Sequence, residues 1–177
     1  MQKIFLYALI LLLALGCNAL PETSNKKMLK PLSTTHDSLM QTIHQVQKES
    51  IKTLGVLVYE GVNDLDYAGP LYILGQLMGV EKQLIGLKEG PVRTVMGVEL
   101  RPGTTIDQVE QLDLLIIPGG ARGTILAAYD SDLLEWIRKI DQNSLYTASV
   151  CTGSWILAAS GLLKDKRATT NWYRAEE

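Results

Sequence analysis

The sequence predicts an α/β domain built around a mostly parallel sheet, and two observations lead to this prediction. From about Thr53 onward, short apolar runs alternate with helical segments. Several of these runs, such as Leu112 to Ile117, are apolar at consecutive positions, as in strands covered on both faces. Strands that alternate with helices in this way are typical of a parallel sheet flanked by helices.

The first half of the domain begins with a predicted strand over 54–59, which is rich in β-branched residues. A helix is expected over 64–77, with Pro70 near its first turn. A second strand is expected over 83–87, followed by a hairpin-like segment over 92–100.

The second half continues the alternation. A buried strand over 112–117 precedes two helical segments, about 122–129 and 131–142, of which the second has one apolar face. A last strand is expected over 145–150, followed by a helix that ends at Gly161.

The N-terminus resembles an export signal. Lys3 precedes an apolar run from Ile4 to Leu15, which is shorter than the roughly 20 residues that span a bilayer and fits a secretory signal. Gly16 and Cys17 complete a pattern similar to a bacterial lipobox, although leucine is usual where Ala14 stands. Residues 1–17 are therefore predicted to be a signal peptide of a lipoprotein lipidated on Cys17, in the cell envelope facing the periplasm or exterior. A plain secretory signal is the alternative.

Residues 18–52 are polar and predict a tether between the membrane and a single domain over 53–177. A short amphipathic helix behind Thr34 or Thr35 is possible within this tether. His36 and His44, the two histidines of the chain, also lie there, without the cluster of further ligands that a metal site needs. No metal and no cofactor is predicted.

Charge and cysteine content exclude other classes. A formal charge of -2 and a pI near 5.7 give no basic footprint for nucleic acid. Cys17 and Cys151 are the two cysteines, so lipidation or removal of Cys17 leaves Cys151 without an intramolecular disulfide partner.

Cys151 lies at the junction between the last predicted strand and its helix. A tight turn at this point places the sulfur at the helix N-terminus, where the backbone N–H groups and the helix dipole stabilise a thiolate. The same geometry exposes the nucleophile of hydrolases. Cys151 is thus a candidate nucleophile, and the alternative is an inert buried cysteine.

Other candidates follow the neighbouring strands, because ligands of such sheets bind at the carboxyl ends of the strands. Gly119 and Gly120 can bring backbone N–H groups to an oxyanion or substrate, or can simply form a tight turn. Thr152 can supply a hydroxyl beside the sulfur or cap the helix. Asp66 is the acid expected against Cys151, protonated by burial and like charge, and otherwise stabilises its own helix.

Four segments together resemble the ThiJ/PfpI superfamily, which is related to class I glutamine amidotransferases. They are the loop from Tyr59 to Pro70, the run Leu114 to Gly120, the elbow Ser149 to Ser154, and the stretch from Gly161 to Trp172. The resemblance covers about 53–177. It implies a flavodoxin-like three-layer sandwich, a homodimer, and a cysteine with an acidic partner at the elbow.

Within this superfamily the elbow indicates a subgroup. Protease-like and glyoxalase-like members carry histidine after the cysteine, whereas this chain has Thr152 there and no histidine in the domain. Cysteine followed by threonine, with L-D-x-x-G-P at Leu65 to Pro70, resembles isonitrile hydratases and the sensor domains of AraC-type regulators. The hydratase resemblance implies that Cys151 attacks the terminal carbon of a small isonitrile, that Asp66 transfers a proton, and that Thr152 with the Gly119 and Gly120 backbone orients the adduct.

The chain departs from the family at two places. Asn171 stands where the family has histidine, and members continue beyond the position of Glu177, so the C-terminal part of the family fold is expected to be missing. The alternative function is a ligand-binding or redox-sensing module in which Cys151 is oxidised and not used in turnover.

Overall fold

The computed structural model describes Ser38 and residues 51–174. The chain divides into two compact units, 1–50 and 51–177, and the second is described below. The predicted signal peptide, Cys17, both histidines and nearly all of the predicted tether lie outside the described residues. Within the described part of the chain, no helix is long and apolar enough to cross a membrane.

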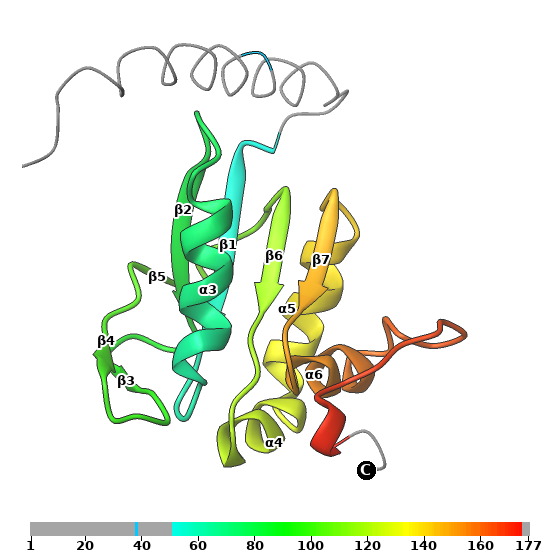
Figure 1. The fold of residues 1–177 in the computed structure, drawn as a ribbon. Helices are drawn as coiled ribbons and strands as arrows, with labels where there is room; N and C mark the ends of the chain where they lie inside the picture. Colours follow the sequence, from blue (N-terminus) through cyan, green and yellow to red (C-terminus); the bar gives the residue numbers. More distant parts are fainter. Residues whose placement is uncertain (1–37, 39–50, 175–177) are drawn as a thin grey trace, which may run out of the picture. The chain divides into compact units, whose positions relative to one another are not determined.

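A five-stranded sheet forms the centre of the domain, with its strands in the order β5-β2-β1-β6-β7 (Figure 1). Every neighbouring pair in it is parallel. The strands are β1 (Thr53–Val58), β2 (Glu81–Gly86), β5 (Thr104–Thr105), β6 (Leu114–Ile117) and β7 (Tyr146–Ser149). The predicted parallel α/β class is confirmed.

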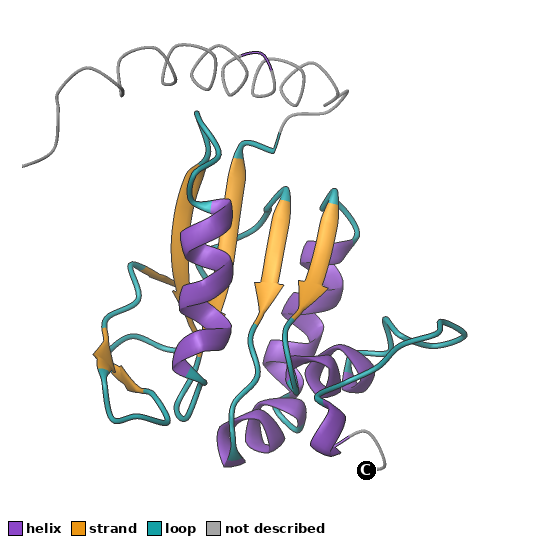
Figure 2. Ribbon diagram, viewed as in Figure 1, coloured by secondary structure: helices purple, strands orange, loops and turns teal. Residues whose placement is uncertain are grey.

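Helices cover both faces of this sheet (Figure 2). Helix α3 (Asp64–Leu74) lies on one face, and α5 (Ser131–Asp141) and α6 (Gly153–Ala159) lie on the other, with α4 (Arg122–Ala128) packed against α6. Strand β6 explains the division, because its consecutive apolar residues alternate between the two layers. Leu114 and Ile116 pack with the α3 side, and Leu115 and Ile117 pack with the α5 and α6 side. The three-layer sandwich thus follows from strands that are apolar on both faces.

Helix α5 has the apolar face that its sequence predicted. Leu133, Trp136, Ile137 and Ile140 are its buried residues. Its N-terminus is capped by Asp130, whose carboxylate accepts a hydrogen bond from the Leu133 N–H at 3.1 Å.

Helix α3 differs from the prediction in two details. It ends at Leu74, before residue 77, with Gly75 as its C-cap. Pro70 is the seventh residue of the helix and lies in its second turn. A proline there cannot donate to the carbonyl of Asp66, four residues earlier, so one hydrogen bond of the helix is absent at a residue of the candidate site.

The segment between β2 and β6 contains the predicted hairpin and one strand that the sequence did not predict. Strands β3 (Val92–Arg93) and β4 (Glu99–Leu100) pair antiparallel, as expected. Strand β5 has two residues, both threonine, and so lacks the apolar run by which a strand is recognised in a sequence.

Candidate functional site

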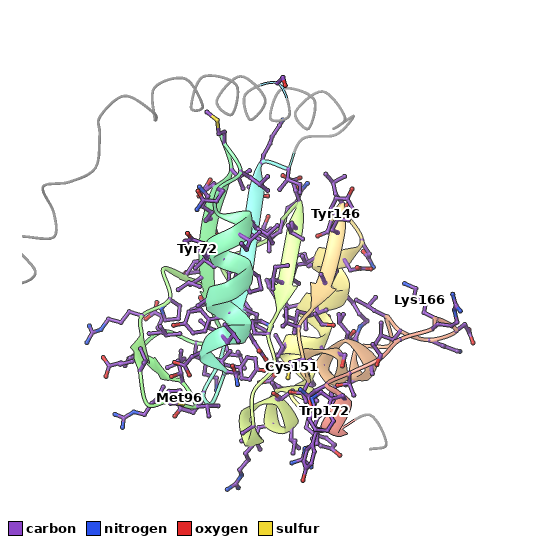
Figure 3. The ribbon with its side chains drawn as sticks, viewed as in Figure 1. Tyr72, Met96, Tyr146, Cys151, Lys166 and Trp172 are labelled. Carbon is purple, nitrogen blue, oxygen red and sulfur yellow. The ribbon has the colours of Figure 1, made fainter. Side chains whose placement is uncertain are left out.

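The strand-to-helix turn between β7 and α6 holds Cys151 in a left-handed backbone conformation, with φ of 55°. Such a conformation costs about 1–2 kcal/mol for a residue other than glycine, so the surrounding structure must hold it in place. Cys151 lies beyond the carboxyl ends of β6 and β7, where α6 begins (Figure 3). Its side chain is half-buried.

Close packing of α6 against β6 fixes this turn. A Cβ at Gly153 would lie 2.1 Å from the carbonyl oxygen of Ile117, so the first residue of α6 must be glycine. Two hydroxyls also donate to the carbonyl of Cys151, Ser154 Oγ at 3.2 Å and Thr170 Oγ1 at 3.4 Å.

Asp66 reaches the same place from the first turn of α3. The residue is 8% exposed, and its Oδ2 atom is buried without a hydrogen-bond partner. Burial raises the pKa of the Asp66 carboxyl above its ordinary value of 3.8, and the nearby Cys151 side chain and Gly119 N–H only partly oppose this. A protonated carboxyl within hydrogen-bonding reach of the sulfur can act as a proton donor.

The loop after β6 brings Gly119 against Asp66 and Thr152. A Cβ at Gly119 would lie 2.7 Å from Thr152 Oγ1 and 2.9 Å from Asp66 Oδ2, so glycine is required for both to approach. Gly119 also accepts a hydrogen bond at 2.9 Å from the Asn63 N–H, which ties this loop to the one after β1. The Gly120 N–H donates to Thr152 Oγ1 at 3.2 Å. The structure therefore brings Asp66, Gly119, Gly120, Cys151 and Thr152 together.

Thr152 occupies the N-cap position of α6, but its side chain does not cap that helix. Its hydroxyl instead donates to the carbonyl of Gly120 at 3.1 Å. The threonine is thus held by the neighbouring loop, and it remains beside the nucleophile.

Two further residues join this site that the sequence analysis missed. The Tyr59 hydroxyl lies 3.0 Å from Thr124 Oγ1, which lies 3.4 Å from Thr152 Oγ1. Both residues are buried. A tyrosine at the end of a strand and a threonine in a helix carry no signal of this contact, because 65 residues separate them in the sequence.

A cavity of about 280 Å³ borders the loop after β6 and the start of α6. Its lining includes two residues of the candidate site, Gly120 and Thr152, and is completed by Ala121, Arg122, Ile125, Trp155 and Arg174. Among the described residues, no group of three or more histidine, cysteine or acidic side chains is placed to hold a metal ion. The arrangement supplies a thiol and an acid, with a small cavity beside them that Cys151 and Asp66 do not line.

Comparison with known proteins agrees with this geometry. The chain is 40% identical over 119 residues to an isonitrile hydratase of Pseudomonas putida, a match that covers 67% of this chain and 52% of that protein. It is also 34% identical over 83 residues to the HTH-type transcriptional regulator CdhR of Pseudomonas aeruginosa, covering 47% of this chain and 24% of the regulator. The chain thus spans about half the length of the hydratase that it matches.

Solved structures have the same fold. A THiJ/PfpI family protein from Pseudomonas syringae superimposes with a TM-score of 0.68 at 30% identity, covering 89% of this chain and 59% of that one. DJ-1 of Schizosaccharomyces pombe superimposes with a TM-score of 0.60 over 70% of each chain, and at 18% identity it shows the fold alone. The sequence profile of the DJ-1/PfpI family matches residues 52–177. This chain therefore belongs to the DJ-1/PfpI family.

Proposed function

We propose that the protein is an exported, cysteine-dependent enzyme that adds water to the terminal carbon of a small isonitrile. The observation that carries this proposal is the pairing of a strained, half-buried Cys151 with a buried Asp66 whose pKa is raised. The identity to an isonitrile hydratase supports the choice of substrate class. The proposed lyase needs no cofactor.

In the first step the Cys151 thiolate forms a bond to the isonitrile carbon while protonated Asp66 transfers its proton to the same carbon. The product is a thioformimidate, in which the carbon is bonded to sulfur and double-bonded to nitrogen. Asp66 becomes a carboxylate. Burial raises the pKa of this carboxyl and so favours the neutral form, which is the form that can donate the proton.

In the second step water adds across the carbon–nitrogen double bond. The Asp66 carboxylate takes a proton from the water and passes it to nitrogen, while the hydroxide forms the new bond to carbon. The carbon–sulfur bond then breaks, the hydroxyl proton returns to Asp66, and an N-substituted formamide leaves. Thiolate and protonated carboxyl are both regenerated, so the cycle balances.

The test is conversion of a simple isonitrile, such as cyclohexyl isocyanide, to its formamide. Cys151→Ala and Asp66→Asn are each expected to lower the rate by at least about 10³-fold, because each removes a reacting group. Asp132→Asn, at the start of α5, is a matched control with the same change of charge and should keep the wild-type rate.

Formamide production that survives Cys151→Ala would overturn the proposal. If the wild-type protein forms neither formamide nor a thioformimidate, mild peroxide treatment decides for the redox-sensing alternative. Formation of sulfenic or sulfinic acid at Cys151 in the wild type, with a lower yield in Asp66→Asn, would support a sensor. Asp66 would then stabilise the oxidised sulfur.

A homodimer is part of this proposal. Apolar side chains are exposed along α3 and on the neighbouring hairpin turn, where Leu65 is 76%, Tyr72 72% and Met96 78% exposed. The two segments are joined, because the Met96 N–H donates to Asp64 Oδ2 at 3.1 Å. No charged side chain of α3 other than Asp64 and the buried Asp66 interrupts this surface, which suits a second copy of the chain. Tyr72→Glu should convert a dimer to a monomer in light scattering, and an unchanged mass would contradict the assignment.

The cell envelope is the proposed location, with Cys17 lipidated. The apolar run before Gly16 and Cys17 supports it. Palmitate labelling that disappears in Cys17→Ser is the expected result, and labelling that persists in this variant would contradict an anchor at Cys17.

A further inference from the structure

A chain of three buried hydroxyls runs from the core of the domain to the candidate site. It begins at Tyr59, which donates to the carbonyl oxygen of Pro118 at 2.7 Å, and continues through Thr124 to Thr152. The three residues are 3%, 0% and 5% exposed, so bulk water does not compete for their hydrogen bonds. None of them is explained by packing alone, since each places a polar atom in the interior.

The directions of these hydrogen bonds follow from counting hydrogens. A carbonyl oxygen only accepts, so the single hydrogen of Tyr59 is directed to Pro118. Thr124 must then donate its own hydrogen to Tyr59, and it is left with lone pairs toward Thr152. The hydrogen of Thr152 is therefore directed to Gly120 O or to Thr124, both inside the protein.

The same counting describes what Thr152 presents to a ligand. One lone pair of its oxygen accepts the Gly120 N–H at 3.2 Å. The second lone pair of this oxygen is available to a ligand, whereas its hydrogen is already used inside the protein. A ligand atom that hydrogen-bonds to Thr152 Oγ1 must consequently be a donor, such as a water molecule.

We propose that Tyr59 and Thr124 are positioning residues that hold Thr152 as a hydrogen-bond acceptor for the water consumed in the second step. This inference rests on the proposed function. Thr152 Oγ1 and Asp66 Oδ2 both lie within 3 Å of the point that a Cβ of Gly119 would occupy. The two oxygens thus lie on the same side of Gly119, where one accepts a hydrogen of the water and the other takes the proton that is transferred.

The test separates the two steps of the reaction in Tyr59→Phe. Loss of the phenol hydroxyl frees Thr124 to donate toward Thr152, and the fixed direction of the chain is lost. Formation of the thioformimidate on Cys151 should stay within about twofold of wild type, whereas its hydrolysis should slow about tenfold, the effect of one hydrogen bond. The adduct should therefore accumulate, as measured by intact-protein mass spectrometry after rapid quenching.

Matched variants distinguish positioning from loss of structure. Thr124→Val removes one of the two groups that can accept the Thr152 hydrogen and should also slow hydrolysis, and Thr124→Ser, which keeps the hydroxyl, should restore it. Thr147→Val removes a buried hydroxyl that has no hydrogen-bond partner, and Tyr129→Phe removes an exposed one, so both should match wild type. Equal slowing of adduct formation and hydrolysis in Tyr59→Phe, or no slowing of either, would overturn the positioning role.

A neutron diffraction structure of the wild-type protein tests the direction of the hydroxyl by itself. Deuterium on Thr152 Oγ1 directed to Gly120 O or Thr124 is expected, and deuterium directed toward Cys151 would overturn the inference whether or not the protein turns over an isonitrile. Absence of both adduct and formamide in the wild type would instead overturn the proposed function, and the role in the water step with it.

Discussion

Asp66 and Asp113 lie at opposite ends of the central sheet, and the protein shifts the pKa values of the two carboxyls in opposite directions. Asp113 directly precedes β6, and its Oδ2 accepts hydrogen bonds from Lys52 N–H at 2.7 Å and Thr53 N–H at 2.9 Å. These bonds, led by the one from Lys52, lower the pKa of Asp113 below 3.8. Asp66, beyond the carboxyl ends of the strands, has a raised pKa and an oxygen without a partner.

The difference separates a structural carboxylate from one that is available for chemistry. At the amino end of the sheet the charge of Asp113 is used to join the start of β1 to the start of β6. At the carboxyl end one oxygen of the Asp66 carboxyl has no hydrogen-bond partner, and the carboxyl lies next to a cysteine in a strained conformation. An ionisable group with a raised pKa and an unpartnered oxygen is a candidate for a functional role.

The largest expected effect tests whether the close approach at the carboxyl end matters. In Gly119→Ala the new Cβ would lie 2.7 Å from Thr152 N and 2.9 Å from Asp66 Oδ2, so both must move. We expect hydration of an isonitrile to fall at least about 10²-fold, because displacements of this size disrupt a reacting geometry. Gly103→Ala is the control, with no atom within 4 Å of the added Cβ. Wild-type turnover in Gly119→Ala would mean that the positions of Asp66 and Thr152 are not needed.

A smaller effect is expected at the amino end, on stability. Asp113→Asn replaces charge-assisted hydrogen bonds with neutral ones, and the free energy of unfolding should fall by about 1–2 kcal/mol at pH 7. Since the folded-state pKa of Asp113 is lowered, this contribution is present above the unfolded value near 3.8 and is lost as pH falls through the folded value. Urea unfolding followed by tryptophan fluorescence measures it, and a loss that persists unchanged at pH 2 would contradict the electrostatic cause.

The same experiment on Asp66→Asn should give the opposite sign. The folded-state pKa of Asp66 is raised, so the ionised carboxyl destabilises the folded protein. Wild type and variant should be equally stable below about pH 3.8, and the variant should gain stability over wild type as pH rises through the raised folded value. The expected gain is about 1 kcal/mol, as for one buried polar group. An Asp66→Asn variant less stable than wild type at pH 7 would contradict the prediction that the buried Asp66 carboxyl destabilises the folded protein.

The smallest effect concerns the strain at the elbow. Cys151→Gly removes the strain of the left-handed conformation, which is about 1–2 kcal/mol. Glycine also raises the conformational entropy of the unfolded chain, which destabilises the folded protein by about 0.5–1 kcal/mol. Cys151→Gly should thus be more stable than Cys151→Ala by about 0.5–1 kcal/mol. Thermal unfolding of the two variants at matched pH provides the comparison, and a Cys151→Gly variant less stable than Cys151→Ala would contradict strain at this position.

Much of the fold was predictable from local patterns. Strand β6 and helix α5 were found within about two residues because a consecutive apolar run and an apolar helix face are written directly in the sequence. Helix α6 was harder, since it begins at Gly153, three residues before its apolar run. Its start is set by contact with the Ile117 carbonyl, which is distant in sequence.

The sequence by itself determined the alternation of strands and helices, the elbow at Cys151 and the family to which the chain belongs, because each of these is carried by consecutive residues. Only the tertiary structure decided that Asp66 is buried with an unpartnered oxygen, that Gly119 admits both Asp66 and Thr152, and that Tyr59 and Thr124 reach the site. The physical reason is that desolvation and the direction of a hydrogen bond depend on which groups meet in space. In this domain the hydroxyl groups that meet come from segments 28 to 65 residues apart in the chain.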